Sequence, residues 1–104
     1  PWFMEVKGVT LDMDGTAMFP DAPTERGIRH LEGLAQAVKD GYGAAALFVI
    51  QMKGVHAFSP HRERHPEFAD ALKKAKENGV HIWAYDCAVT DRSMKLDAPV
   101  PVIL

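Results

Sequence analysis

The sequence predicts a single α/β domain in which helices cover a mixed β-sheet. Short apolar runs of strand length alternate with segments whose apolar residues recur every three or four positions, as in amphipathic helices. The chain has 104 residues, 47% of them hydrophobic and 25% charged, which suits one core and leaves no room for two. The expected order is strand, strand, helix, strand, helix, strand and an extended tail. Because helices connect the later strands, these strands should pair in parallel.

The first half of the chain contains two expected strands and one helix. Residues 2–11 are rich in aromatic and β-branched types and end at an Asp-Met-Asp-Gly turn signal at residues 12–15. A short strand at residues 16–19 follows and is ended by proline. Thr24 is then a suitable N-cap for a helix with apolar residues at helical spacing, which ends before Gly41.

The second half supplies a buried strand, a loop, a helix and another strand. Residues 44–50 form a short continuous apolar run, so we expect a strand that is buried on both faces at the centre of the sheet. Residues 52–65 combine glycine, proline, histidines and charges, and are predicted to form a loop with little regular structure. Pro66 begins the second helix, and residues 80–89 form the next strand. Two prolines in residues 96–104 restrict the extended tail to a sheet edge or a surface strap.

The composition excludes some classes of protein to which the chain could belong. A formal net charge of −2 excludes a globally basic nucleic-acid binder, so such binding would need a local patch. Cys87 is the only cysteine, which excludes an internal disulfide and suits a reducing compartment. With no apolar run long enough to span a bilayer and no leader at the start, we expect a cytoplasmic protein without a membrane partner. The opening directly on a strand-like segment, without an initiating Met, indicates a fragment.

Glu5 and Lys7 form the first candidate site. On a strand, residues i and i+2 project from the same face, roughly 7 Å apart. Phosphodiester hydrolysis uses a hard divalent cation held by carboxylate and main-chain oxygens, with a second cationic group nearby. Glu5 and the carbonyl of Val6 could hold the metal, while Lys7 orients water or offsets developing charge. Taken alone, the tripeptide more often is an ordinary surface ion pair.

Longer blocks surround this pair of residues. They read Glu-Val-Lys-Gly-Val-Thr-Leu at residues 5–11, Phe-Pro-Asp-Ala-Pro-Thr-Glu-Arg-Gly at residues 19–27 and His-Leu-Glu at residues 30–32, and further short matches continue to Pro-Val-Ile-Leu at the end. Together they resemble the sugar fermentation stimulation (SfsA) family over essentially the whole chain. The resemblance implies a restriction-endonuclease-like PD-(D/E)xK fold, a mixed sheet flanked by two helices. Glu5 and Lys7 would be the second half of its nuclease motif, and Mg or Mn its cofactor.

The resemblance also implies what surrounds this domain. Family members carry, upstream of this strand, an OB-like domain and an acidic residue that would complete the metal site. This chain shows neither, so residues 1–104 are expected to be the nuclease-like C-terminal domain. His65 also departs from the family, which tends to have an acidic residue there. The implied function is non-specific DNA binding linked to the regulation of sugar metabolism. An active Mg- or Mn-dependent nuclease in the full-length form is the alternative, and a homodimer is left open.

Further candidate residues follow the second strand and occupy the first helix. Asp21 could reach a metal held by Glu5, although a role in the turn after Pro20 is the simpler explanation. The candidates for phosphate contact on the helix are Thr24, Arg26 and His30. A threonine at the position of Thr24 is more often only a helix cap. Arg26 and His30 lie one turn apart and away from the apolar stripe, so they could contact phosphate or simply be solvated.

The segment of residues 52–65 contains the local basic patch. Lys53, Arg62 and Arg64 against one glutamate give a balance of +2, and Arg62 and Arg64 are the residues expected to grip a nucleic-acid backbone. An ordinary surface loop would have the same composition. His61 and His65 have the i, i+4 spacing of a zinc pair, but no third ligand is evident.

A rival motif lies at the turn signal. A hydrophobic strand followed by Asp12-Met13-Asp14-Gly15-Thr16 matches the signature of haloacid dehalogenase phosphatases, with Asp12 as nucleophile and Asp14 as acid or base. Such an enzyme needs a later acidic pair for magnesium, and none follows. The simpler interpretation is a β-hairpin turn.

Overall fold

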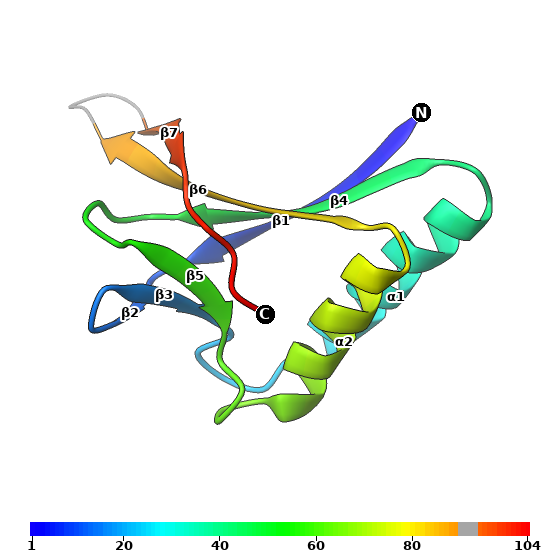
Figure 1. Ribbon diagram of the computed structural model, residues 1–104, viewed down its shortest axis with the longest axis horizontal. Helices are drawn as coiled ribbons and strands as arrows, with labels where there is room; N and C mark the ends of the chain where they lie inside the picture. Colours follow the sequence, from blue (N-terminus) through cyan, green and yellow to red (C-terminus); the bar gives the residue numbers. More distant parts are fainter. Residues whose placement is uncertain (90–93) are drawn as a thin grey trace.

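The computed structural model describes residues 1–89 and 94–104 and arranges them as two sheets and two helices (Figure 1). Along the chain the elements are β1 (Trp2–Val9), β2 (Leu11–Met13), β3 (Thr16–Phe19), α1 (Glu25–Lys39), β4 (Gly43–Ile50), β5 (Ala57–Pro60), α2 (Pro66–Glu77), β6 (His81–Val89) and β7 (Met94–Pro99). This architecture confirms the predicted fold class, a mixed sheet flanked by two helices.

The larger sheet has the strand order β1-β4-β6-β7. Strands β1, β4 and β6 are parallel, and β7 runs antiparallel to β6 at the edge. The apolar strand β4 lies inside the sheet, as predicted, with Phe48 and Ile50 almost fully buried on the face that the helices cover. The expected burial on both faces is found only in part, because Leu47 and Val49 on the other face are only half-buried. The extended tail contributes the edge strand β7, which is the position that its prolines allow.

The smaller sheet has the order β2-β3-β5. Strands β2 and β3 form a hairpin whose turn residues Asp14 and Gly15 have φ values of 54° and 90°, and the Gly15 amide donates to the Asp12 carboxylate at 2.8 Å. The expected continuous strand at residues 2–11 therefore ends at Val9, and a separate strand β2 follows. Left-handed conformations at both central positions are typical of a type I′ hairpin turn.

Strand β5 corrects the prediction for residues 52–65, which were expected to lack regular structure. Residues 57–60 pair in parallel with β3, and on the other side the backbone of Phe58 bonds to Pro101 and Ile103 at 2.8 Å each. Phe58 is fully buried. The strand thus depends on partners that are distant in sequence, and a four-residue segment ending in proline carries little local signal for it.

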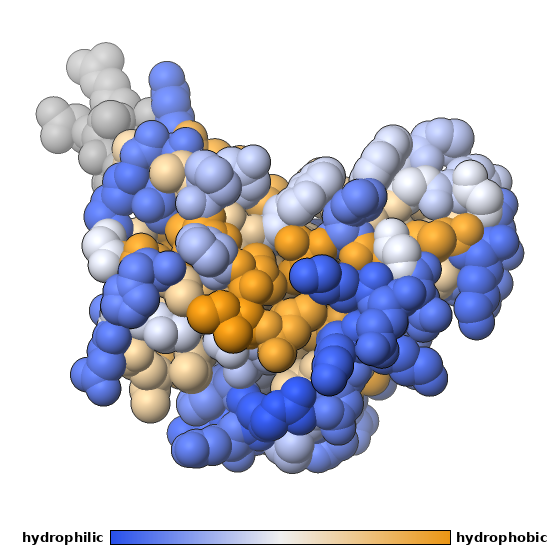
Figure 2. Space-filling model, in the orientation of Figure 1, coloured by the Kyte–Doolittle hydropathy of each residue, from blue (hydrophilic) through white to orange (hydrophobic). Residues whose placement is uncertain are grey.

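Both helices cover the same side of the larger sheet (Figure 1). The core lies between them and the sheets, where the rings of Phe48 and Phe58 stack with centroids 4.5 Å apart and Phe19 packs against Phe48 and Phe68. Figure 2 shows apolar surface at the centre of the view, where the C-terminal tail crosses, beside the hydrophilic side chains of α2. The tail therefore closes one side of the core.

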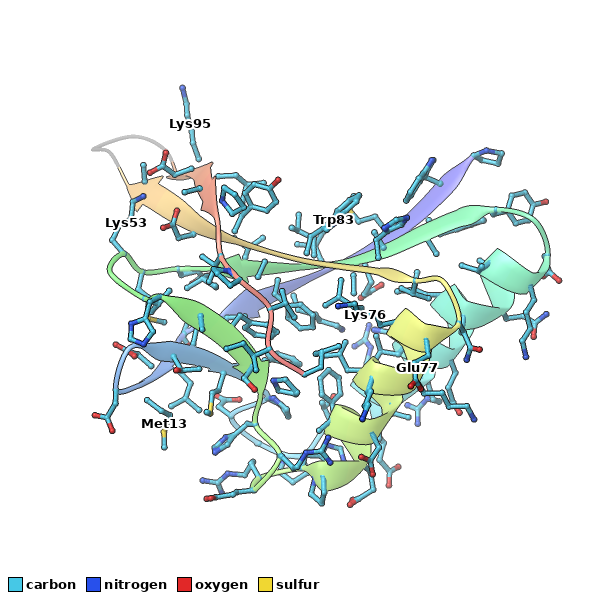
Figure 3. The ribbon with its side chains drawn as sticks, in the orientation of Figure 1. Met13, Lys53, Lys76, Glu77, Trp83 and Lys95 are labelled. Atoms are coloured by element: carbon cyan, nitrogen blue, oxygen red, sulfur yellow. The ribbon has the colours of Figure 1, made fainter. Side chains whose placement is uncertain are left out.

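Lys53, in the loop that follows β4, links that loop to strands β6 and β7 (Figure 3). Its ammonium group pairs with Asp86 of β6 at 3.1 Å and also with Asp97 of β7. Asp86 is buried, and it accepts a further hydrogen bond from the Ala98 amide at 2.9 Å. The Ala98 hydrogen bond and Lys53 lower the pKa of Asp86 despite its burial, and the two aspartates raise the pKa of Lys53.

The other face of the larger sheet carries an aromatic cluster. Trp2 of β1 and Trp83 of β6 stack with centroids 6.1 Å apart, and His81 packs against both rings. Figure 3 shows Trp83 on the side of the sheet away from the helices. Trp2 and Trp83 are 58% and 37% exposed, so this face is apolar and open to solvent.

Candidate functional site

Strand β1 and helix α1 bring three polar side chains together. Glu5 and Lys7 are level with Ala46 and Phe48 of β4, and therefore project from the face of the sheet that the helices cover. The Lys7 Nζ lies 3.2 Å from the Glu5 Oε1 and 2.8 Å from the Nδ1 of His30, which comes from the second turn of α1. The His30 Nδ1 is also 3.0 Å from the Glu5 Oε1.

The His30 ring has a polar partner at each of its two nitrogens. At Nδ1, the ammonium of Lys7 can donate to a nitrogen that carries no hydrogen, whereas a hydrogen on Nδ1 would be donated to the Glu5 carboxylate. At Nε2, the Nε of Arg26 lies 3.5 Å away and donates to a ring nitrogen that carries no hydrogen. Lys7 and His30 therefore share the carboxylate of Glu5 as their common partner.

The cluster stands at one end of an open groove of about 380 Å³ between β1 and α1. Glu5 and His30 line it together with the apolar surfaces of Phe3, Leu34 and Tyr42. Phe3 and Tyr42 meet edge to face, with centroids 5.4 Å apart. The polar atoms of the cluster are thus partly sheltered but accessible, because the side chains of Lys7 and Glu5 are 20% and 35% exposed.

The remaining predicted residues occupy other places. Asp21 lines a small hollow of about 40 Å³ beside Gly8 and Thr10, where β1 ends, and Glu5 does not line this hollow. Thr24 is the N-cap of α1, and its hydroxyl accepts a hydrogen bond from the Gly27 amide at 3.0 Å.

The basic residues before α2 lie apart from the cluster around Glu5. Arg62 pairs with Asp70 of α2 at 2.7 Å, and Arg64 lines a hollow with Pro23 and His61. His61 and His65, which have the spacing of a zinc pair, are buried and make structural contacts. The His65 Nδ1 accepts from the backbone amide of Thr24 at 3.1 Å, which joins the starts of the two helices, and His61 contacts the Pro20 carbonyl.

The turn residues Asp12 and Asp14 are exposed on the β2–β3 hairpin. In a haloacid dehalogenase the nucleophile stands at the carboxyl end of a parallel strand, whereas β2 is antiparallel to its only partner in the described sheet. The geometry of the turn therefore favours the hairpin interpretation over the phosphatase one.

A hard divalent cation needs several converging oxygen ligands. In the cluster, Glu5 supplies one carboxylate, and it is engaged by Lys7. Within residues 1–89 and 94–104, no three His, Cys, Asp or Glu side chains are grouped so that they could hold a metal ion. The described side chains therefore fit part of a metal site and do not form a complete one.

Sequence reasoning placed Glu5 and Lys7 together on one face of β1, but it did not reveal their contact with His30 or the other residues that line the groove. His30 was expected as a phosphate contact, and its link to Glu5 and Lys7 was not expected. Phe3 lies two residues before Glu5 on the same strand, so the alternation of β1 was a usable signal for its place in the groove. Tyr42 follows α1 and had no such signal.

The mixed sheet flanked by two helices defines the class of protein, a restriction-endonuclease-like α/β domain. A family model described as the RE domain of the sugar fermentation stimulation protein, SfsA, matches residues 1–93. The chain belongs to this family.

Curated relatives and one solved structure agree with this assignment. The chain is 56% identical over 102 residues to a sugar fermentation stimulation protein homolog from Clostridium beijerinckii, and 50% identical over 103 residues to one from Clostridium acetobutylicum. These matches cover 98% and 99% of this chain but only 45% of each relative, so the chain spans less than half of their length. The structure of SfsA from Pyrococcus furiosus in complex with Ca²⁺ superposes with a TM-score of 0.89 at 30% identity, over 97% of this chain and 44% of that one. None of the helices described here could span a membrane.

Proposed function

We propose that this chain is a DNA-binding domain with a nuclease-like site, belonging to a protein that is linked to the regulation of sugar metabolism. The observation that carries the proposal is the cluster of Glu5, Lys7 and His30, sheltered between β1 and α1. An ammonium and an imidazole can donate hydrogen bonds to a phosphodiester, and a carboxylate beside them can hold a cation or act as a general base.

Lys7 is the principal phosphate ligand in this proposal. Its ammonium is held in place by Glu5 and His30, so little side-chain freedom is lost when a phosphate oxygen replaces one of these acceptors. Arg26, one turn before His30, adds a second positive charge on the same side of α1. Because these contacts go to the backbone of the nucleic acid, binding should be independent of sequence.

An active Mg- or Mn-dependent nuclease in the longer relatives is the second candidate. The Ca²⁺ in the Pyrococcus furiosus structure supports cation binding within the family. A bound divalent cation would supply Lewis-acid activation of the phosphodiester. Glu5 is the side chain of this chain that would contribute to holding it. The other ligands would have to come from outside the described cluster, so we expect this chain to bind nucleic acid without cutting it.

Fluorescence anisotropy with a labelled DNA duplex over a range of salt concentrations tests the proposal. Lys7→Ala should weaken binding for all sequences and reduce the slope of log K against log salt by about one unit. Lys73→Ala, which removes an exposed lysine on α2, is the matched control and should leave the slope unchanged. If both variants bind like the wild type, the cluster does not contact DNA.

A further inference from the structure

Two buried histidines fix the segment before α2 to the segment before α1. The His65 Nδ1 accepts a hydrogen bond from the Thr24 amide at 3.1 Å. The His61 Nδ1 lies 3.3 Å from the Pro20 carbonyl, and it donates to this oxygen because a carbonyl can only accept. His61 and His65 are 9% and 7% exposed, so water competes little for either contact. The starts of the two helices are therefore held together.

The segment before α2 is itself a closed turn. The amides of Arg64 and His65 both donate to the His61 carbonyl, at 3.1 and 3.0 Å. In this conformation Arg64 lines an open hollow of about 320 Å³ together with His61 and Pro23, which directly precedes the cap of α1. Because the backbone around Arg64 is already fixed, only side-chain freedom is lost when its guanidinium binds a ligand.

The two arginines of this turn differ in their partners. Arg62 pairs with Asp70 of α2 at 2.7 Å. Within residues 1–89 and 94–104, no carboxylate lies within 4.0 Å of the guanidinium of Arg64, which is exposed. A guanidinium binds a phosphate through two parallel N–H donors. Arg64 is therefore the member of the pair that is available for a phosphate.

We propose that this hollow is a second phosphate subsite for nucleic acid, with Arg64 as the ligand and His65 as the residue that positions it. The inference rests on the proposed function, in which Lys7 binds another phosphate of the same molecule. Lys7 is in contact with His30, which lies six residues after Thr24, about 9 Å along the axis of α1. Phosphates of one DNA strand recur about every 3.4 Å of the duplex axis, so one nucleic acid spans both subsites.

Fluorescence anisotropy with a labelled DNA duplex, titrated at several salt concentrations, tests Arg64 as the ligand. Arg64→Ala should reduce the slope of log K against log salt by about one unit for every sequence. Arg62→Ala is the matched control, because the same side chain two positions away is already paired with Asp70, and its slope should stay near that of the wild type. An unchanged slope for Arg64→Ala, or equal losses in both variants, would overturn the proposal.

Lys7→Ala in the same titration separates this inference from the proposed function. If the slope falls in Lys7→Ala but not in Arg64→Ala, the second subsite alone is wrong. If the slope is unchanged in Lys7→Ala, the proposed function itself is wrong.

The acidic residue of the hollow gives a test of opposite sign. Glu63 lines the hollow beside Arg64, and its carboxylate repels a phosphate bound there. Glu63→Gln should therefore strengthen binding roughly two- to fivefold, the range of an interaction between exposed charges. Glu77→Gln is the control, because Glu77 is an exposed residue at the other end of α2, and it should bind like the wild type. Unchanged or weaker binding by Glu63→Gln would contradict a phosphate in the hollow.

A double-mutant cycle tests His65 as the positioning residue. His65→Ala removes the acceptor for the Thr24 amide and should reduce the salt slope as much as Arg64→Ala does, with no further loss in the double variant. His65→Asn keeps an acceptor near the position of the Nδ1 atom and should restore the slope. Urea denaturation checks that each variant is folded under the binding conditions. Additive losses of the two alanine variants, or no recovery in His65→Asn, would overturn the role of His65.

Discussion

Among single residues, Asp86 makes the clearest contribution to stability that depends on pH. Its pKa is lowered by the hydrogen bond from the Ala98 amide and by Lys53, so the folded state favours the carboxylate. The stabilisation is complete above the pKa of an unfolded aspartate, about 3.9, and is lost as the pH falls through the lower pKa of the folded state. Protonation of this buried carboxylate in acid therefore weakens its contacts with Lys53 and with Ala98 of β7, and so weakens the attachment of β7 to β6.

We expect Asp86→Asn to change how the free energy of unfolding depends on pH in the acid range. The variant should be less stable than the wild type at pH 6, and the difference should narrow between pH 4 and pH 2, because the wild type alone must take up a proton at this position. Urea denaturation at several pH values measures this. The exposed Asp14→Asn is the control and should follow the wild-type profile. A constant difference at all pH values would show that the charge of Asp86 has no role.

Residue spacing predicts part of the cluster formed by Glu5, Lys7 and His30, and misses the rest. Alternation along a strand predicted that Glu5 and Lys7 share a face, and this requires only local geometry. The contact of Lys7 with His30 joins residues 23 positions apart and depends on how α1 is seated on the sheet. Apolar packing of the whole core sets that position, so the periodicity of the helix does not reveal it.

Among the elements, α1 depends on a side-chain cap that can be removed alone. Thr24→Ala deletes the acceptor for the Gly27 amide and should lower the free energy of unfolding by about 1 kcal/mol. Thr24→Ser retains the hydroxyl and should stay near the wild type. Thermal or urea denaturation compares the two. If the alanine variant is fully stable but binds DNA more weakly, Thr24 acts as a nucleic-acid contact and not chiefly as a cap.

The segment before α2 allows a separate test of the basic residues. If it contacts phosphates, replacing both Arg62 and Arg64 with alanine should weaken DNA binding for all sequences and reduce the salt slope by about one unit per lost contact. Asp70→Asn frees Arg62 from its ion pair and keeps the positive charge, so this control should bind at least as well as the wild type. An unchanged slope in the double variant would show that this segment takes no part.

The elements also differ in how far local sequence predicts them. Strand β4 was predictable because a short unbroken apolar run marks a strand inside a parallel sheet, although its outer face is only half-buried here. Both helices were predictable from capping residues and apolar spacing. Strand β5 was missed, since its pairing with β3 and the tail joins segments about 40 residues apart on each side, and its own four residues carry no alternation.

For the whole molecule, the expected activity of the isolated chain is binding without cleavage. Glu5 is the one carboxylate in the cluster, and a hard cation held by so few oxygens binds weakly. A plasmid-nicking assay with manganese or magnesium should therefore give no nicked product from the 104-residue chain. The double variant Glu5→Ala, Lys7→Ala serves as the background control. Nicking by the chain that vanishes in this variant would show that the site is complete by itself, with Asp21 as the leading candidate for a further ligand.

The stacked tryptophans on the outer face of the sheet provide an optical signal. The chain contains only these two tryptophans, Trp2 and Trp83, and both are on the face opposite to Glu5 and Lys7. The intrinsic tryptophan fluorescence of the chain therefore reports on the surroundings of that outer face. A partner that covers this outer face should shift the emission to shorter wavelength as Trp2 is shielded from water, whereas a phosphodiester bound beside Lys7 on the helix side should leave it unchanged. Two events at opposite faces of one strand can thus be followed separately in the same unlabelled sample.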